Sequence, residues 1–323
     1  MENTETDLKP KLPFNNLYLL SGLTSGFNQF WMYIVTLSFL LVGYVGYQAL
    51  VAFPLVELAK KNGITTEQIF ENNNLIFDSD ALHIDRNIIL LLLFGMFVFA
   101  FAGFLIGLKA IHKKTLTSVL TGYQKFRFKR FWFAFAVWAS MLVFTVLVSF
   151  IIEPGSLTFN FNAGGFIVSL LLMLVFMPLQ TGVEEVVFRG YLLQGLSQIF
   201  KNGIVPIIIT SVLFGLAHIS NPEVREYGTG IMLSYYIGFA LFMGVLTLLD
   251  EGLELAFGIH FANNIISSIL VTQPHSVIKT YSIFEAKADD PGAEIILWFC
   301  MTAVTFTIFY VKYRWKNFNL IIK

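Results

Sequence analysis

The sequence predicts an all-α fold, a polytopic bundle of about eight transmembrane helices. Two features of the chain lead to this prediction. Of its 323 residues, 56% are hydrophobic and only 13% are charged, which is a composition typical of membrane proteins. The apolar residues also gather in long runs with few or no charges, and about 20 such residues suffice to cross the hydrocarbon core of a bilayer as a helix.

The apolar runs place the expected helices. The eight expected spans cover residues 31–55, 88–108, 131–152, 165–200, 204–219, 228–249, 253–271 and 295–311. The run 165–200 would be about 54 Å long as a straight helix, so it must tilt, protrude, or kink at Pro178 or Gly182. The first 30 residues are polar and lack the basic start of a cleaved signal peptide. We therefore expect the first span to act as an uncleaved targeting signal.

The chain divides into four expected parts. These are a polar cytoplasmic N-terminus (1–30), three N-terminal membrane helices (31–164), a catalytic core (165–272), and a last part with a loop, the final span and a basic tail (273–323). The loop 109–130 has seven Lys and Arg residues and no acid, and basic loops stay in the cytoplasm. We therefore expect both termini to be cytoplasmic in a multi-pass membrane protein, and in the cell membrane if the source is bacterial.

The net charge of the chain is zero, so the basic stripe typical of nucleic-acid-binding proteins is absent and we expect no nucleic-acid partner. The bilayer itself is an expected partner. Asp250 and Glu251 end the sixth expected span, and we expect this acidic pair to face water at the helix end.

Charged residues inside the fourth expected span need an explanation. Glu184, Glu185 and Arg189 lie between apolar runs, and each ionised group near the bilayer centre costs about 2.5–3.5 kcal/mol on insertion scales. Glu185 and Arg189 are four residues apart, so they share a helix face and can pair. Glu184 projects away from this pair and has no evident local partner. Such residues usually mark a functional site.

Two further polar clusters follow in apolar helices: His218 at the end of one, and His260 with Asn264, four apart, on another. If 165–200 and 204–219 form a hairpin around Gly203, Glu184 and His218 lie at heights that differ by roughly 6 Å. A single membrane histidine is usually a packed, hydrogen-bonded group, and His260 with Asn264 could join helices. The three clusters together favour a catalytic site.

The three clusters also resemble the motifs of a known family. The chain reads EEVVFR at 184–189, FGLAH at 214–218 and HFANN at 260–264. This order resembles the signature of the CPBP intramembrane proteases, which include the type II CaaX prenyl endopeptidases and the Abi bacteriocin-processing proteins. The resemblance covers about residues 165–272.

The resemblance implies roles for these residues. Glu184 and His218 would activate the attacking water, and His260 and Asn264 would stabilise the oxyanion. Glu185 and Arg189 would form a supporting pair. The family is often described as metalloproteases, and zinc would be held by Glu184, His218 and His260. Because the chain contains no HExxH motif, we expect no cofactor, with zinc as the alternative.

The expected function is that of an intramembrane endopeptidase, a CaaX prenyl endopeptidase-like hydrolase. Its substrate would be a membrane-embedded peptide or protein, lipidated or not, cut near the membrane surface. The alternative is a non-catalytic membrane scaffold or bacteriocin self-immunity protein of the same fold. A transporter is a weaker alternative, since paired halves with broken helices are not evident in the sequence. The residues required by rhomboid, site-2 and aspartyl intramembrane proteases are missing.

Overall fold

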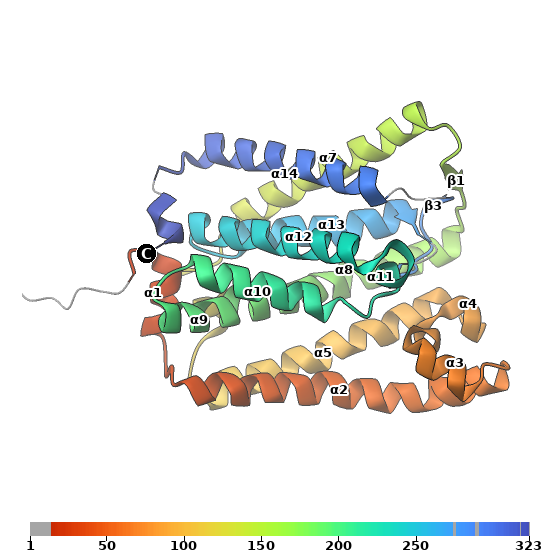
Figure 1. Ribbon diagram of the computed structural model, residues 1–323, viewed down its shortest axis with the longest axis horizontal. Coiled ribbons are helices and arrows are strands. Elements are labelled where there is room, and N and C mark those ends of the chain that lie inside the picture. Colours follow the sequence, from red (N-terminus) through yellow and green to blue (C-terminus); the bar gives the residue numbers. More distant parts are fainter. Residues whose placement is uncertain (1–13, 274–275, 288–290, 317, 323) are drawn as a thin grey trace, which may run out of the picture.

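The computed structural model describes residues 14–273, 276–287, 291–316 and 318–322. Long helices lie side by side and run between two ends of the molecule (Figure 1). This confirms the predicted all-α helical bundle. The long helices are α2 (Phe30–Lys61), α5 (Arg86–Ala110), α7 (Phe128–Ile152), α8 (Ala163–Glu185), α12 (Thr229–Asp250) and α14 (Pro291–Tyr313), with the shorter α9 (Leu193–Phe200), α10 (Ile204–Ala217) and α13 (Glu254–Leu270) among them.

The expectation of eight spans is wrong. Among the described residues, six helices are long and apolar enough to cross a membrane, the fourth of them running from Ala163 to Phe200. The two exceptions are α10, with 14 residues, and α13, with 17, which are only about 21 and 26 Å long at 1.5 Å per residue. Both helices nevertheless run within the bundle beside longer ones (Figure 1). The chain is a multi-pass membrane protein.

The stretch from α8 to α9 is one continuous helical rod whose geometry changes part-way. Helix α8 continues through Pro178 and Gly182, where a kink was one of three alternatives. The departure from α geometry comes later, in the π-helical segment η2 (Val186–Leu192). A π-helix has one more residue per hydrogen-bonded ring than an α-helix, and such segments are frequent at functional sites. Here it follows directly after the two adjacent glutamates.

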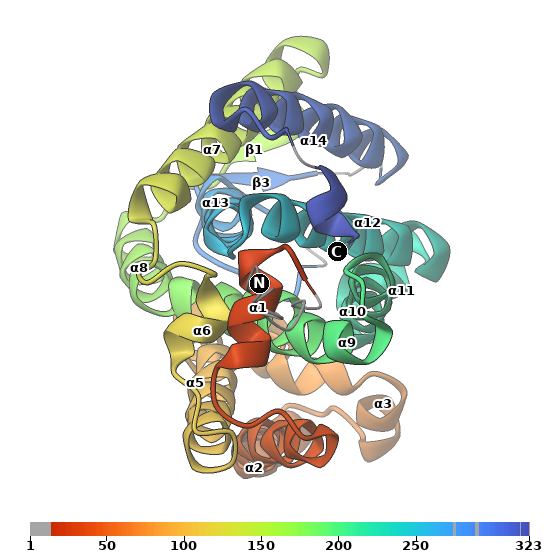
Figure 2. The ribbon, with the colours of Figure 1, turned by 90° about the vertical axis from the view of Figure 1, so that its left-hand side faces the viewer.

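The two ends of the bundle differ. At one end lie α1 (Leu17–Thr24), α6 (Leu116–Leu120), η3 (Phe318–Ile321) and the C-terminus, as the end-on view shows (Figure 2). The opposite end carries α3 (Thr66–Glu71), η1 (Asn73–Phe77), α4 (Ser79–Leu82), α11 (Pro222–Tyr227) and a small sheet of β1 (Leu157–Phe159), β2 (Val271–Thr272) and β3 (Phe284–Ala286). In this sheet the central β3 pairs antiparallel with β1 and parallel with β2. We call these the terminal end and the strand end.

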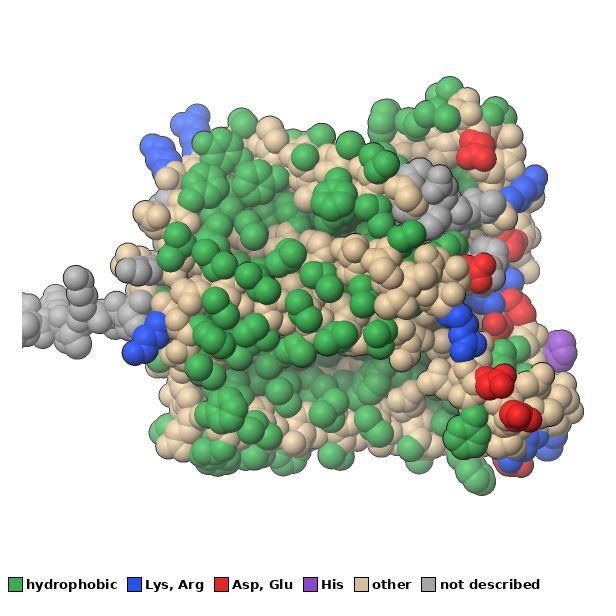
Figure 3. Space-filling view, in the orientation of Figure 1, with side chains coloured by type: hydrophobic (Ala, Val, Ile, Leu, Met, Phe, Trp, Pro, Cys, Tyr) green, Lys and Arg blue, Asp and Glu red, His purple; other side chains and the backbone are tan. Residues whose placement is uncertain are grey.

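Helix α13 lies in the interior of the bundle, between α7, α8 and α12 (Figure 2). A glycine permits its close approach to α7, because a Cβ atom at Gly258 would lie 2.3 Å from the carbonyl oxygen of Phe131. Trp138 of α7 and Ile259 of α13 are fully buried at this contact. The outer helices expose many large apolar side chains, which cover the face in Figure 3, while charged side chains gather at the two ends. This distribution fits a bilayer around the middle of the bundle.

Candidate active site

The predicted pair of Glu185 and Arg189 is present and buried. Arg189 Nη1 donates to Glu185 Oε1 at 2.9 Å, and the two side chains are 1% and 0% exposed. The guanidinium also stacks over the ring of Phe214, with Cζ 4.1 Å from the ring centroid. A buried carboxylate needs such compensation, since an unpaired buried charge is strongly destabilising. The pair also ties the π-helix η2 to α10, because Phe214 belongs to α10.

Glu185 has a second partner on a distant helix. Its Oε1 accepts a hydrogen bond from Nδ1 of His260 at 2.7 Å. Because a carboxylate accepts, His260 Nδ1 carries the proton, and the orientation of the imidazole is fixed. The other ring nitrogen, Nε2, then lies 3.5 Å from Glu184 Oε2. The pair of Glu185 and Arg189 therefore orients the His260 ring so that its Nε2 points toward Glu184.

Glu184 does have a local partner, contrary to the sequence-based expectation. Gln180, one helical turn earlier in α8, donates from Nε2 to Glu184 Oε1 at 2.5 Å. Its amide oxygen accepts from Asn264 Nδ2 at 3.2 Å. Gln180 thus joins the glutamate of α8 to the asparagine of α13. The sequence reasoning missed this residue, although its spacing of four from Glu184 in an apolar helix was a usable signal.

Asn264 is oriented by a short chain of hydrogen bonds. Its Oδ1 accepts from Asn263 Nδ2 at 3.2 Å, and Asn263 Oδ1 accepts from Trp138 Nε1 at 3.1 Å. An indole can only donate, so this chain fixes both amides. The Asn264 amide nitrogen is left facing Gln180 and, beyond it, Glu184.

His218 lies beside this network without a direct bond to Glu184. It is the residue that ends α10, and its Nδ1 donates to the carbonyl oxygen of Phe214 at 2.7 Å. The ring lies between Phe214 and Tyr236, with centroids 4.4 and 4.6 Å away. Among the described residues, no hydrogen bond or ion pair joins His218 to the other predicted catalytic side chains. Phe214 connects them instead, since its ring centroid is 6.2 Å from that of His260.

These observations together define the candidate active site. The structure places the hydrogen-bonded group of Arg189, Glu185 and His260 beside that of Glu184, Gln180 and Asn264. The two groups form one network through the 3.5 Å contact between His260 Nε2 and Glu184 Oε2, and His218 lies at its edge. Glu184 is 13% exposed, whereas Glu185 is fully buried. Among the described residues, no protein donor lies at ordinary hydrogen-bonding distance from Glu184 Oε2. Such a free carboxylate oxygen, close to the imidazole of His260, can accept a proton from water.

The alternative of a zinc centre can be compared with the arrangement of these side chains. In the part of the chain that the structure describes, no group of three His, Cys, Asp or Glu side chains is arranged to hold a metal ion. His260 and His218 both use Nδ1 for protein contacts. Glu185 is committed to an arginine. Nε2 of each histidine and Glu184 Oε2 remain, and these are the atoms that would hold zinc if it bound, because a metal-ligating imidazole commonly donates its other ring N–H to the protein.

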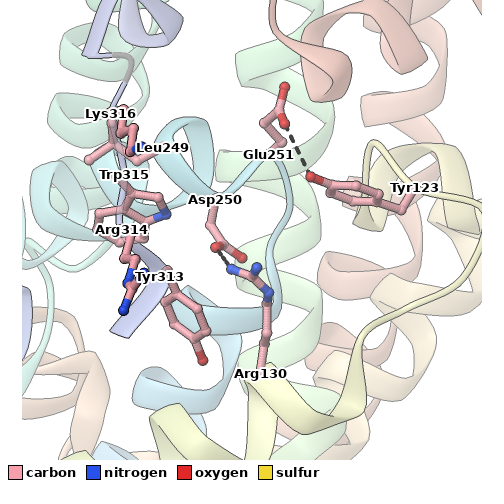
Figure 4. A pocket seen from close by; sticks show the side chains of 9 residues that line it. All are labelled: Tyr123, Arg130, Leu249, Asp250, Glu251, Tyr313, Arg314, Trp315 and Lys316. Carbon is pink, nitrogen blue, oxygen red and sulfur yellow. Dashed lines mark hydrogen bonds and ion pairs between the residues drawn. The ribbon is translucent and has the colours of Figure 1, made fainter. Parts of the chain in front are cut away.

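A pocket of about 330 Å³ lies at the terminal end, away from this network. Figure 4 shows its lining, which consists of Tyr123, Arg130, Leu249, Asp250, Glu251, Tyr313, Arg314, Trp315 and Lys316. Asp250 was expected to face water, but it is only 3% exposed. Its Oδ2 binds Arg127 at 2.9 Å and its Oδ1 binds Arg130. Both carboxylate oxygens are therefore occupied by arginines that fasten α12 to the start of α7.

Comparison with known proteins gives a family match for part of the chain. Residues 163–266 match the model of the family "Type II CAAX prenyl endopeptidase Rce1-like". The chain contains an Rce1-like domain. This domain runs from α8 into α13 and holds the whole network, from Gln180 to Asn264, so the resemblance seen in the three motifs is confirmed. A similar protein is the uncharacterized protein YyaK of Bacillus subtilis (strain 168), 27% identical over 260 residues, or 80% of this chain and 82% of YyaK. No solved structure matches the chain.

Proposed function

We propose that this protein is an intramembrane endopeptidase whose Rce1-like domain hydrolyses a peptide bond of a membrane-embedded peptide or protein, lipidated or not. The family match supports a CaaX protease type of activity. The observation that carries the more specific proposal is the free oxygen of Glu184. Its Oε1 is held by Gln180, while its Oε2 faces His260 Nε2 across 3.5 Å. We assign the reacting groups to a position beside this pair, within reach of both atoms.

In the proposed reaction, Glu184 takes a proton from a water molecule as the water oxygen attacks the carbonyl carbon of the peptide bond. His218 helps to orient this water, because its Nδ1 donates to the backbone and Nε2 keeps a lone pair. The tetrahedral oxyanion receives hydrogen bonds from His260 Nε2, in the doubly protonated ring, and from Asn264 Nδ2. The carbon–nitrogen bond then breaks, and Glu184 returns the proton to the leaving amine. Glu185 balances the charge of His260.

We also propose that this chemistry needs no metal; the proposal is supported by the absence, among the described residues, of three His, Cys, Asp or Glu side chains grouped as metal ligands. Purified, active protein should retain cleavage after dialysis against a zinc chelator and should contain much less than one equivalent of zinc by elemental analysis. Stoichiometric zinc whose removal abolishes cleavage, and whose return restores it, would overturn this part of the proposal.

The activity is tested by comparing Glu184→Gln with the wild type. A host strain without its own copy expresses either form, and new N-termini in membrane proteins are identified by mass spectrometry. Glu153→Gln is the matched control, since Glu153 is exposed at the end of α7. We expect cleavage products with the wild type and Glu153→Gln, and none with Glu184→Gln at equal protein level. Products that persist with Glu184→Gln would favour a non-catalytic scaffold or immunity protein.

A further inference from the structure

The burial of α12 and α13 changes sharply along their length. Residues 239–250 of α12 and 254–262 of α13 are nearly all buried, whereas residues 229–238 are all at least partly exposed and only Ile265 is buried in 263–270. The two helices run in opposite directions, so both buried halves lie toward the terminal end and both open halves toward the strand end (Figure 1). His260 lies at the boundary between the two.

Toward the terminal end, tightly packed side chains close the site. Phe239 packs edge-on against His260 with centroids 5.3 Å apart, and it is 4% exposed. Phe214 and Arg189, with 2% and 1% exposure, close the side of α8 and α10. Tyr191, two residues beyond Arg189 in the π-helix, is also buried. Water and a peptide have no room to enter from this direction, since packed interiors leave few voids.

Toward the strand end, the side chains near the site are polar and increasingly accessible. His260, Asn264 and Ser267 share one face of α13, and they pass from buried through half-buried to exposed. On the facing helices, Asn221 donates to the hydroxyl of Tyr236 at 3.2 Å, and both are half-buried. Polar groups at membrane depth are tolerated where they line a water-filled cavity. The route to the site therefore runs along α13 from the strand end.

The charges of the two ends place this route relative to the membrane. The loop 109–130 at the terminal end has seven Lys and Arg residues and no acid. Segments 58–87 and 153–164 at the strand end have only three Lys and Arg residues between them, and Figure 3 shows both acidic and basic side chains at that end. By the positive-inside rule, the terminal end is cytoplasmic. The strand end, with the open halves of α12 and α13, then faces outward.

We propose that the site opens to the extracytoplasmic side, and that the substrates are peptide segments that enter it from the outer leaflet or the outer surface. The substrate class rests on the proposed function, whereas the direction from which the site is reached does not depend on catalysis. A cytoplasmic C-terminal peptide would meet the closed, aromatic side of the site. Secreted peptides and the outer ends of membrane-anchored proteins are the substrate class that fits.

The experiment uses single cysteines and a membrane-impermeant maleimide. The native Cys300 is exposed, so Cys300→Ala provides the background. Ser267→Cys reports on the route, and its hydroxyl makes only a local bond to the Asn263 carbonyl. Lys201→Cys is the control at the terminal end, where Lys201 is exposed. Each variant is labelled in intact spheroplasts and in inverted vesicles, with and without Glu184→Gln.

We expect Ser267→Cys to label in intact spheroplasts to the same extent as after permeabilisation, and Lys201→Cys to label only in inverted vesicles. Labelling of Ser267→Cys only in inverted vesicles would overturn the orientation. Its failure to label from either side would overturn the aqueous route. The labelling should be the same in the Glu184→Gln background. If the protein proves not to be an enzyme, the labelling result would still show from which side the site is reached.

Discussion

Arg189→Met tests whether the buried ion pair holds the site together. The substitution keeps an unbranched side chain of similar length but removes the guanidinium. Glu185 would then keep only His260 as a partner, and its carboxylate is fully buried. Removing one partner of a buried ion pair costs about 3–5 kcal/mol, because the other charge stays uncompensated. The lost contact with Phe214, at 4.1 Å, adds about 1–2 kcal/mol for a desolvated cation–π interaction.

A double variant separates the charge from the packing. In Glu185→Gln with Arg189→Met, the carboxylate is gone, while the Gln carbonyl can still accept from His260 Nδ1. Replacing both members of a buried pair is often close to neutral, so we expect most of the loss to be recovered. The coupling between the two positions should then be several kcal/mol in magnitude, well above the roughly 0.5 kcal/mol seen for independent sites.

The assay is equilibrium unfolding in mixed micelles with increasing SDS, followed by far-UV circular dichroism. Lys129→Met is the control, because Lys129 is exposed near the start of α7, and it should shift the free energy of unfolding by no more than about 0.5 kcal/mol. A loss below about 1 kcal/mol for Arg189→Met, where 3–5 is expected, would refute the reasoning. So would a double variant that is less stable than the single one.

Three further predictions concern other buried polar groups. Burial lowers the pKa of Lys114 from 10.5 to about 8, so between these pH values the unfolded chain binds a proton that the folded chain has lost. The wild type should therefore gain up to about 3 kcal/mol of stability relative to Lys114→Met as pH rises from 8 to 10.5. A difference in unfolding free energy that does not change with pH would contradict this. Burial raises the pKa of Glu223 above 4.5, so ionisation of this side chain disfavours the folded state. Thermal unfolding should show Glu223→Gln to be more stable than the wild type at pH 8 and equally stable at pH 3.5. Equal stability of the two proteins at both pH values would contradict this prediction. Gln180→Met should lower the rate constant of cleavage while leaving the Michaelis constant nearly unchanged, because Glu184 loses its positioning donor. Gln180→Glu should regain activity only at low pH, where a protonated carboxyl can donate to Glu184. An unaltered pH profile of Gln180→Glu would argue against a positioning role for Gln180.

Local features of the site could be predicted from the sequence, because helical spacing fixes which side chains are neighbours. The pair of Glu185 and Arg189 follows from a spacing of four residues, and the structure contains it. The same rule would have found Gln180 beside Glu184. It was missed because the search for partners considered charged residues only, although an amide can hold a carboxylate as well as an ammonium group can.

Contacts between helices could not be predicted in the same way. His260 and Glu185 are 75 residues apart, and Asn264 and Gln180 are 84 apart. Their meeting depends on how α13 packs between α7 and α8, and on the rotation of each helix about its axis, neither of which is encoded in a spacing. The motif order indicated that the residues converge but could not tell which carboxylate the imidazole binds. The π-helix at 186–192 has no recognised sequence signal either.

The error in the number of spans is connected to the site itself. The two helices that are too short are α10, which ends at His218, and α13, which carries His260 and Asn264. A helix that ends inside the membrane leaves backbone groups without helical partners, and these are tolerated only where they line a cavity or are covered by protein. Ending α10 at His218 frees the Phe214 carbonyl to accept from the imidazole. The end of α10 therefore provides a backbone carbonyl and a half-buried histidine beside the ring of Phe214, which a longer apolar helix would not provide.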